Sequence, residues 1–147
     1  MKTVVLNGSP RMNKGNTEKI LEPFLEGMKG HQIEITRLYL KKMKVESCMG
    51  CLRCHENGGQ CVIKDDMQIL RKLFYECDLL ILATPIYEFS YTSYMCKAIE
   101  RLLEPLACGE IVLAAGNECY VNHTFKRRIG ILLITNGSFD GEYTFGP

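Results

Sequence analysis

The sequence has no excess of charge of either sign, since 18 Lys and Arg residues against 17 Asp and Glu residues leave a net charge of +1. Proteins that bind nucleic acids normally carry a basic face, which releases counterions from the phosphates. The two short basic runs, at 41–44 and 126–128, are better interpreted as solvated surface. We therefore expect no nucleic-acid partner.

Long hydrophobic runs are missing as well. No segment approaches the roughly 18 to 20 apolar residues that a membrane helix requires. The apolar run at 3–6 ends at an Asn-Gly turn and is far shorter than the hydrophobic region of a signal peptide. We therefore expect no membrane partner and a cytoplasmic location.

Internal repeats, low-complexity tracts and Pro-rich linkers are also absent from the sequence. A chain of 147 residues is long enough to bury one hydrophobic core but too short for two independent ones. We expect a single domain over residues 1–147.

Cysteine, in contrast, is abundant, with eight residues in the chain. Cytosolic thiols stay reduced, so this number indicates metal or redox chemistry rather than a disulfide framework. Four of the eight share one segment in the spacing Cys-x2-Cys-x2-Cys-x6-Cys: Cys48, Cys51, Cys54 and Cys61. Two consecutive Cys-x2-Cys steps favour an iron-sulfur cluster over zinc, whose sites usually pair two well-separated couples. A structural zinc site and four free thiols remain as alternatives.

The rest of the chain alternates between strand and helix patterns. Apolar runs at 79–83 and 129–134 are typical of strands buried on both faces of a parallel sheet, and this alternation predicts an α/β fold. Pro85 is expected to end its strand, and Pro23 to kink or delay the first helix. The apolar face of that helix is predicted to consist of Ile20, Leu21, Phe24, Leu25 and Met28.

Ligands of such sheets bind at the carboxyl ends of the strands, where three loops qualify: 7–17, 84–92 and 135–138. In the first loop, backbone amides and the positive end of the following helix would converge on a phosphate group. Ser9, Asn16 and Thr17 could donate hydrogen bonds there, with Arg11 as a charge at the rim. The alternative is a polar turn with a hydroxyl cap and no ligand.

The run Asn-Gly-Ser-Pro-Arg at 7–11, continued by Gly-Asn-Thr at 15–17, resembles the FMN phosphate loop of the NADPH-dependent FMN reductases, a branch of the flavodoxin-like proteins. Thr-Pro-Ile-Tyr at 84–87 resembles that family's second flavin loop. The segment at 97–101 resembles the helix after it, with Glu100 where the family usually shows Asp. The resemblance implies a flavodoxin-like, doubly wound parallel sheet that binds FMN. The cofactor-binding residues implied are Ser9, Arg11, Asn16 and Thr17 at the phosphate, and Pro85, Ile86 and Tyr87 along the isoalloxazine. Asn136 and Gly137, in the third loop at the strand ends, are further candidate cofactor-binding residues.

The cysteine motif and the segment 62–67 resemble the iron-sulfur flavoproteins, a subgroup of the same family. This resemblance implies a [4Fe-4S] cluster on Cys48, Cys51, Cys54 and Cys61. The protein would then be an FMN-dependent oxidoreductase that passes electrons between flavin and cluster, with NAD(P)H, a ferredoxin or a quinone-like molecule as the electron donor or acceptor. Two alternatives remain: a cluster-free NAD(P)H-dependent FMN or quinone reductase, and a non-enzymatic zinc-binding module on a flavodoxin-like scaffold.

The residues after the run at 129–134 are too few for the fifth strand and helix of that family, so the fold is expected to be shortened at its C-terminus. Residues 110–115 could supply an irregular strand, another copy of the chain could cover the sheet edge, or flavin binding could be weakened. An uncovered edge strand is an aggregation liability, so we expect a homo-oligomer.

Overall fold

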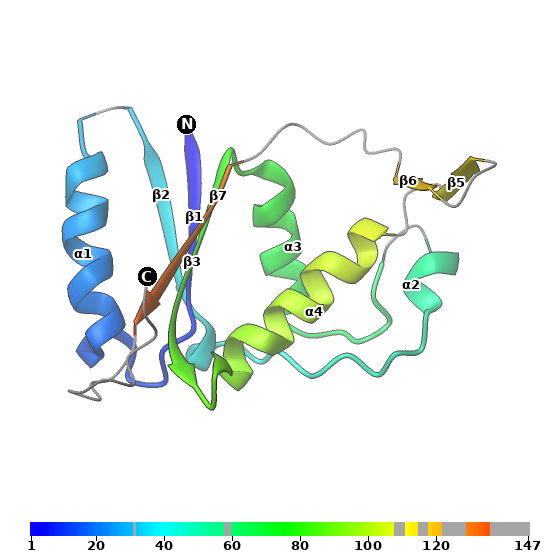
Figure 1. The fold of residues 1–147 in the computed structure, drawn as a ribbon, viewed down its shortest axis with the longest axis horizontal. Helices are drawn as coiled ribbons and strands as arrows, with labels where there is room; N and C mark the ends of the chain where they lie inside the picture. Colours follow the sequence, from blue (N-terminus) through cyan, green and yellow to red (C-terminus); the bar gives the residue numbers. More distant parts are fainter. Residues whose placement is uncertain (31, 58–59, 108–110, 115–117, 122–128, 136–147) are drawn as a thin grey trace.

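The structure is a computed structural model that describes residues 1–147 except 31, 58–59, 108–110, 115–117, 122–128 and 136–147. Its main sheet has four parallel strands in the order β2-β1-β3-β7, and a short strand β4 pairs antiparallel with the end of β3 (Figure 1). The strands are β1 (Lys2–Asn7), β2 (Glu34–Tyr39), β3 (Leu79–Tyr87), β4 (Ser90–Tyr91) and β7 (Ile129–Thr135). Strand order reverses beside β1, which is the arrangement of the flavodoxin-like fold.

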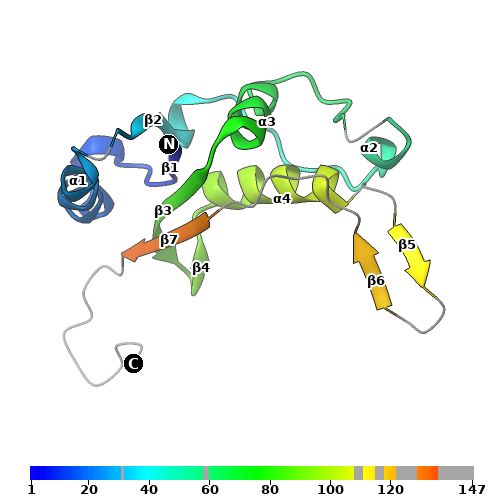
Figure 2. The same ribbon diagram turned by 90° about the horizontal axis from the view of Figure 1, so that it is seen from above.

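Helices cover both faces of this sheet. Figure 2 shows α1 on one side, and α3 and α4 on the other. The helices are α1 (Asn16–Met28), α2 (Arg53–Glu56), α3 (Met67–Glu76) and α4 (Ser93–Ala107), with 3-10 turns η1 (Met12–Lys14) and η2 (Leu40–Lys42). Among the described residues, no helix is both long and apolar enough to span a membrane.

The alternation of side chains along the strands gives the sheet two apolar faces, and each face has its own core. Val5 and Ile81 pack with Leu21 and Leu25 of α1. The opposite face packs against α3 and α4 through buried side chains that include Val4, Leu6, Met67, Leu70, Met95, Ala98 and Leu102. The predicted apolar face of α1 is therefore confirmed except for Ile20, which is 48% exposed.

Pro23 does not delay its helix, and Pro85 does not end its strand. The helix α1 begins at Asn16, well before Pro23, so the proline does not delay its start. Strand β3 continues through Pro85 to Tyr87, so the prediction that Pro85 ends the strand is wrong. The reason is the register: β1 pairs with β3 only as far as Ala83, so the missing N–H of Pro85 interrupts no hydrogen bond to β1.

Of the segment 110–115, the described residues 111–114 do not extend the main sheet. Strand β5 (Ile111–Ala114) pairs antiparallel with β6 (Glu118–Val121) in a separate two-stranded sheet. Among the described strands, β7 has a single neighbour, β3, so one edge of β7 has no described partner. No fifth parallel strand lies in the part of the chain that the structure describes.

Candidate functional site

The loop between β1 and α1 is tied to the carboxyl ends of the neighbouring strands. Gly8 N donates to the carbonyl oxygen of Ala83 at 2.8 Å, and Thr92 Oγ1 donates to the carbonyl oxygen of Gly8 at 2.7 Å. A Cβ atom at Gly8 would lie 3.0 Å from both Thr92 Oγ1 and Met95 Cβ, so the loop passes closely over the start of α4. The loop is thus fixed at the point where strand order reverses.

Within the loop, short hydrogen bonds hold a compact turn around Ser9, which is buried. Ser9 N donates to Asn7 Oδ1 at 2.8 Å, and Ser9 Oγ accepts from Arg11 N at 3.3 Å. Gly15 closes the turn, because a Cβ atom there would lie only 2.6 Å from Ser9 Oγ. No larger residue fits at position 15 without moving Ser9.

The first turn of α1 has no side-chain cap. Its N-cap is Gly15, and no described side chain bonds to the amides of this turn. The first amides of a helix have no partner within the helix and carry the positive end of its dipole, so an uncapped N-terminus that follows a glycine turn suits a phosphate group.

The four predicted phosphate residues divide into two pairs. Ser9 and Thr17 are buried in the wall of the loop, whereas Arg11 and Asn16 are exposed at its rim. Thr17 Oγ1 lies 2.8 Å from Thr135 Oγ1, a buried hydrogen bond that ties the start of α1 to the end of β7. The structure therefore gives Thr17 a positioning contact within the protein.

A buried carboxylate beneath the loop was not predicted. Glu18 Oε2 accepts from Asn7 Nδ2 at 2.7 Å, and Asn7 Oδ1 in turn accepts from Ser9 N. Arg37 of β2 forms ion pairs with Glu18 and Glu22, and Tyr39 Oη donates to Glu18 Oε1 at 3.2 Å. Burial by itself lowers the pKa of Arg37, but the bonds to Tyr39 and Glu22 and the charge of Glu18 outweigh it and raise that pKa.

The second loop presents exposed aromatic side chains. Pro85 and Ile86 are half-buried, whereas Tyr87 is 48% exposed and Phe89, at the tip of the β3–β4 turn, is 84% exposed. Glu88 and Phe89 both have positive φ angles, of 47° and 60°. Residues other than glycine rarely adopt this backbone conformation, and such residues are enriched at functional sites. In the third loop Thr135 is buried, and the predicted residues Asn136 and Gly137 lie outside the described residues.

The four predicted metal ligands are free thiols at different depths. Cys48 and Cys51 are exposed, and Cys54 and Cys61 are half-buried. In the part of the chain that the structure describes, no three Cys, His, Asp or Glu side chains gather closely enough to hold a metal ion. The convergence of the four thiols therefore stays a prediction.

Beneath the cysteine segment lies an enclosed ion pair that sequence reasoning also missed. The side chains of Arg101 and Asp65 are each 1% exposed and form an ion pair. Arg101 NH2 also donates to Cys61 Sγ at 3.4 Å. Burial by itself raises the pKa of Asp65, but the hydrogen bond from Arg101 and those from the backbone N–H groups of Glu46 and Met67 outweigh it and lower that pKa.

Two observations support a fit between this segment and a thiolate-bound cluster. Two of the four sulfurs already accept N–H hydrogen bonds, Cys61 from Arg101 and Cys48 from Gly50 N at 3.4 Å, and such bonds help to set the potentials of iron-sulfur clusters. Arg101 Nε is buried and has no hydrogen-bond partner among the described residues, so the guanidinium retains a donor for a further acceptor. The four thiols and the N–H groups around them are therefore chemically suited to a cluster. In the described part of the chain, the four sulfurs do not converge on one point.

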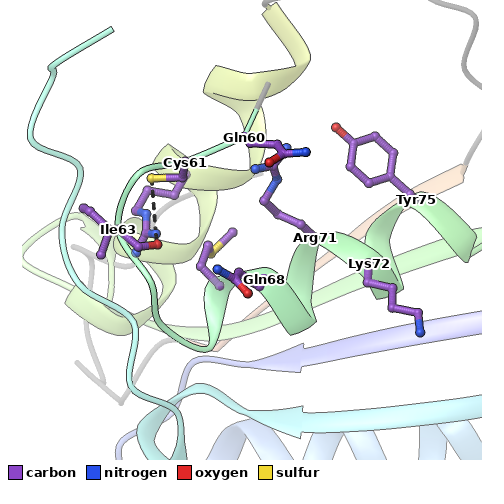
Figure 3. Close-up of a pocket in the computed structure, with 9 residues that line it drawn as sticks. Gln60, Cys61, Ile63, Gln68, Arg71, Lys72 and Tyr75 are labelled. Atoms are coloured by element: carbon purple, nitrogen blue, oxygen red, sulfur yellow. Dashed lines mark hydrogen bonds between the residues drawn. The ribbon is translucent and has the colours of Figure 1, made fainter. Parts of the chain in front are cut away.

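A cavity of about 320 Å³ adjoins Cys61, between the cysteine segment and α3. Figure 3 shows Arg71 and Tyr75 rising from α3 beside Gln60, with Cys61 on the opposite wall. The Arg71 guanidinium lies 6.0 Å from the centre of the Tyr75 ring, in cation–π contact. The cavity is thus next to the cysteine segment and separate from the loop after β1.

Comparisons with known proteins agree with this geometry. The family model for NADPH-dependent FMN reductase matches residues 1–141. An iron-sulfur flavoprotein of Archaeoglobus fulgidus is 37% identical over 103 residues, covering 70% of this chain and 46% of that protein. An iron-sulfur flavoprotein of Methanosarcina thermophila is 28% identical over 141 residues, covering 96% of this chain and 66% of that protein.

Solved structures support the fold. An azoreductase from Bacillus anthracis superposes with a TM-score of 0.67 at 17% identity, over 100% of this chain and 73% of that chain. This likeness confirms the predicted flavodoxin-like α/β fold. The chain spans from about half to two thirds of the length of the two flavoproteins above.

Proposed function

The chain belongs to the NADPH-dependent FMN reductase family, and we propose that it binds FMN at the loop after β1 and acts as a flavin-dependent oxidoreductase. The observation that carries this proposal is the uncapped start of α1 behind the Ser9–Gly15 turn. This turn offers a phosphate monoester the open amides of a helix N-terminus, with Ser9 beside them and Arg11 at the rim.

The residues of this chain would bind and orient the cofactor. Ser9, Asn16 and the first amides of α1 would hold the phosphate, and Pro85, Ile86 and Tyr87 would lie along the isoalloxazine and exclude water from one side. Bound FMN accepts two electrons as a hydride and can release them singly, so no side chain need act as a nucleophile.

We further propose that Cys48, Cys51, Cys54 and Cys61 hold a [4Fe-4S] cluster that exchanges electrons with the flavin. The names of the two flavoprotein relatives and the N–H donors to two of the sulfurs support this assignment. The electron donor or acceptor would be NAD(P)H, a ferredoxin or a quinone-like molecule. The protein would work in the cytoplasm as a homo-oligomer.

A cluster-free NAD(P)H-dependent FMN or quinone reductase is the second candidate. The observation that favours it is the spread of the four thiols, since no three metal-ligating side chains converge among the described residues. A zinc-binding module on the same scaffold would use the four cysteines, but it would not explain why the N-terminus of α1 has no side-chain cap among the described residues.

The deciding experiment is an ultraviolet-visible spectrum of protein purified without oxygen, together with iron, sulfide and zinc analysis. Flavin bands with stoichiometric iron and sulfide are expected. Flavin without iron would leave the cluster-free reductase. Zinc without flavin would overturn the proposed function as a whole.

A further inference from the structure

Arg101 projects from α4 into the base of the cysteine segment, where it is 2% exposed. Enclosing a guanidinium so completely is costly unless its donors are used. The Arg101 guanidinium forms five hydrogen bonds, all to four residues in the range 46–65. The side chain therefore belongs structurally to the cysteine segment, although it lies far from it in the sequence.

These contacts reach both ends of the segment. Arg101 NH1 donates to the carbonyl oxygen of Glu46, before Cys48, at 3.1 Å. Arg101 NH2 donates to the carbonyl oxygen of Ile63, after Cys61, at 3.4 Å. One guanidinium thus holds together the chain that enters the segment and the chain that leaves it.

The carboxylates that follow the segment complete this closure. Asp65 Oδ2 accepts from Glu46 N at 2.8 Å, and Asp66 Oδ2 accepts from Lys44 N at 2.7 Å. Asp66 N returns a bond to the carbonyl oxygen of Lys44 at 3.0 Å. The residues 44–46 and 63–66 therefore form a closed neck, beyond which Cys51 and Cys54 extend.

We propose, on the basis of the cluster assigned above, that Arg101 is a positioning residue for that cluster. It closes the neck before any metal binds, so that assembly requires only the other three thiols to gather at Cys61. Its N–H bond and its charge at the Cys61 sulfur also favour the reduced state of a cluster bound there, because both stabilise added negative charge.

The test compares Arg101→Lys with Arg53→Lys in anaerobically purified protein. Lysine keeps the charge but cannot hold Glu46, Ile63 and Asp65 together as a planar fork does. Arg53 lies within the same segment and is exposed, so it is the matched control. The measurements are iron and sulfide content, loss of iron to a chelator, the midpoint potential of the cluster, and amide hydrogen exchange at Lys44 and Glu46.

The Arg101→Lys protein is expected to lose iron to the chelator about tenfold faster than the wild type, as for other residues that support metal ligands. The backbone amides of Lys44 and Glu46 should exchange about tenfold faster than in the wild type. The reason is that the hydrogen bonds that these amides donate to the carboxylates of Asp66 and Asp65 would be weakened. The midpoint potential should fall, a change that a purely structural role would not produce. Arg53→Lys should match the wild type in every measurement.

If Arg101→Lys does not fold, the double variant Arg101→Gln/Asp65→Asn removes both charges and leaves no unpaired ion buried. Its potential should still fall below that of the wild type. A folded variant with the iron content, potential and exchange rates of the wild type would overturn this inference alone. A wild-type protein without iron and sulfide would overturn the cluster assignment, and the inference with it.

Discussion

Gly15 and Ser9 approach each other more closely than any side chain at position 15 allows, since a Cβ atom would lie 2.6 Å from Ser9 Oγ. We expect Gly15→Ala to push Ser9 out of the turn and to weaken FMN binding at least about tenfold, with a loss of about 1 to 3 kcal/mol in the free energy of unfolding from overpacking. Flavin fluorescence titration and urea denaturation measure the two effects.

Gly27 provides the control for this substitution. It lies in α1, and a Cβ atom there would have no neighbour within 4 Å. Gly27→Ala should therefore raise the free energy of unfolding by about 0.5 to 1 kcal/mol and leave FMN affinity unchanged. Equal FMN affinities of the Gly15→Ala and Gly27→Ala proteins would contradict the assignment of the loop.

Asp65 gives the protein a specific acid sensitivity. Because its pKa in the folded protein lies below the ordinary value of 3.8, its ion pair contributes fully above that pH and is lost as the pH falls through the lowered pKa. At pH 7, Asp65→Asn leaves the Arg101 charge buried and unpaired, at an expected cost of about 3 to 5 kcal/mol in the free energy of unfolding.

The prediction is tested by urea denaturation of the wild type and Asp65→Asn from pH 7 downward. The difference in the free energy of unfolding between the wild type and Asp65→Asn should be constant from pH 7 to about pH 4 and should become smaller below about pH 4. A difference that stays constant down to pH 2 would show that the carboxylate charge is not what stabilises the neck.

At the scale of elements, Glu18 joins α1 to β1 and β2 beneath the loop after β1. Glu18→Gln keeps the shape but removes the charge that Arg37 and Asn7 bind, so we expect a loss of about 1 to 3 kcal/mol in the free energy of unfolding. FMN affinity should fall with it, because Asn7 positions Ser9. Urea denaturation measures the change in the free energy of unfolding, and titration calorimetry with FMN measures the change in affinity.

Glu26→Gln on the same helix is the matched control. Glu26 is exposed and pairs only at the surface with Lys29, and such pairs contribute about 0 to 1 kcal/mol. Should Glu26→Gln weaken FMN binding as much as Glu18→Gln, the connection from Glu18 through Asn7 to the loop would be wrong.

Strands, and the loop proposed to bind FMN, were predictable from the sequence where local pattern determines them. The strands β3 and β7 contain continuous apolar runs, Ser9 belongs to a glycine-rich turn between a strand and a helix, and Thr17 lies in the first turn of that helix. Glu18 and Arg101 were not predictable as buried residues, because a charged residue on a helix normally faces water.

The partners of these two residues explain why they were missed. Arg101 bonds to Glu46, 55 residues away in the sequence, and Glu18 pairs with Arg37, 19 residues away. Such contacts depend on how α4 and β2 pack, which local periodicity does not reveal. The register of β3 is likewise a property of the whole sheet, and it is the reason that Pro85 does not end the strand.

At the scale of the whole molecule, β7 is an edge strand of the described sheet. Leu132 and Ile134 are 43% and 45% exposed on alternate positions of this strand, which therefore presents an apolar stripe. Among the described strands only β3 pairs with β7, so the hydrogen-bonding groups along its other edge face no described strand. Both features favour association with another chain.

We therefore expect the protein to sediment as a homo-oligomer and Leu132→Lys to shift it toward the monomer, since a charge at the stripe opposes its burial. Ile69→Lys, a similar change at a side chain that is 52% exposed on α3, should leave the oligomer intact. Analytical ultracentrifugation, detected by flavin absorbance, measures the mass of the particle and shows whether that particle carries flavin. A wild-type monomer that carries a full complement of flavin would show that neither the edge of β7 nor the flavin site requires a second copy of the chain.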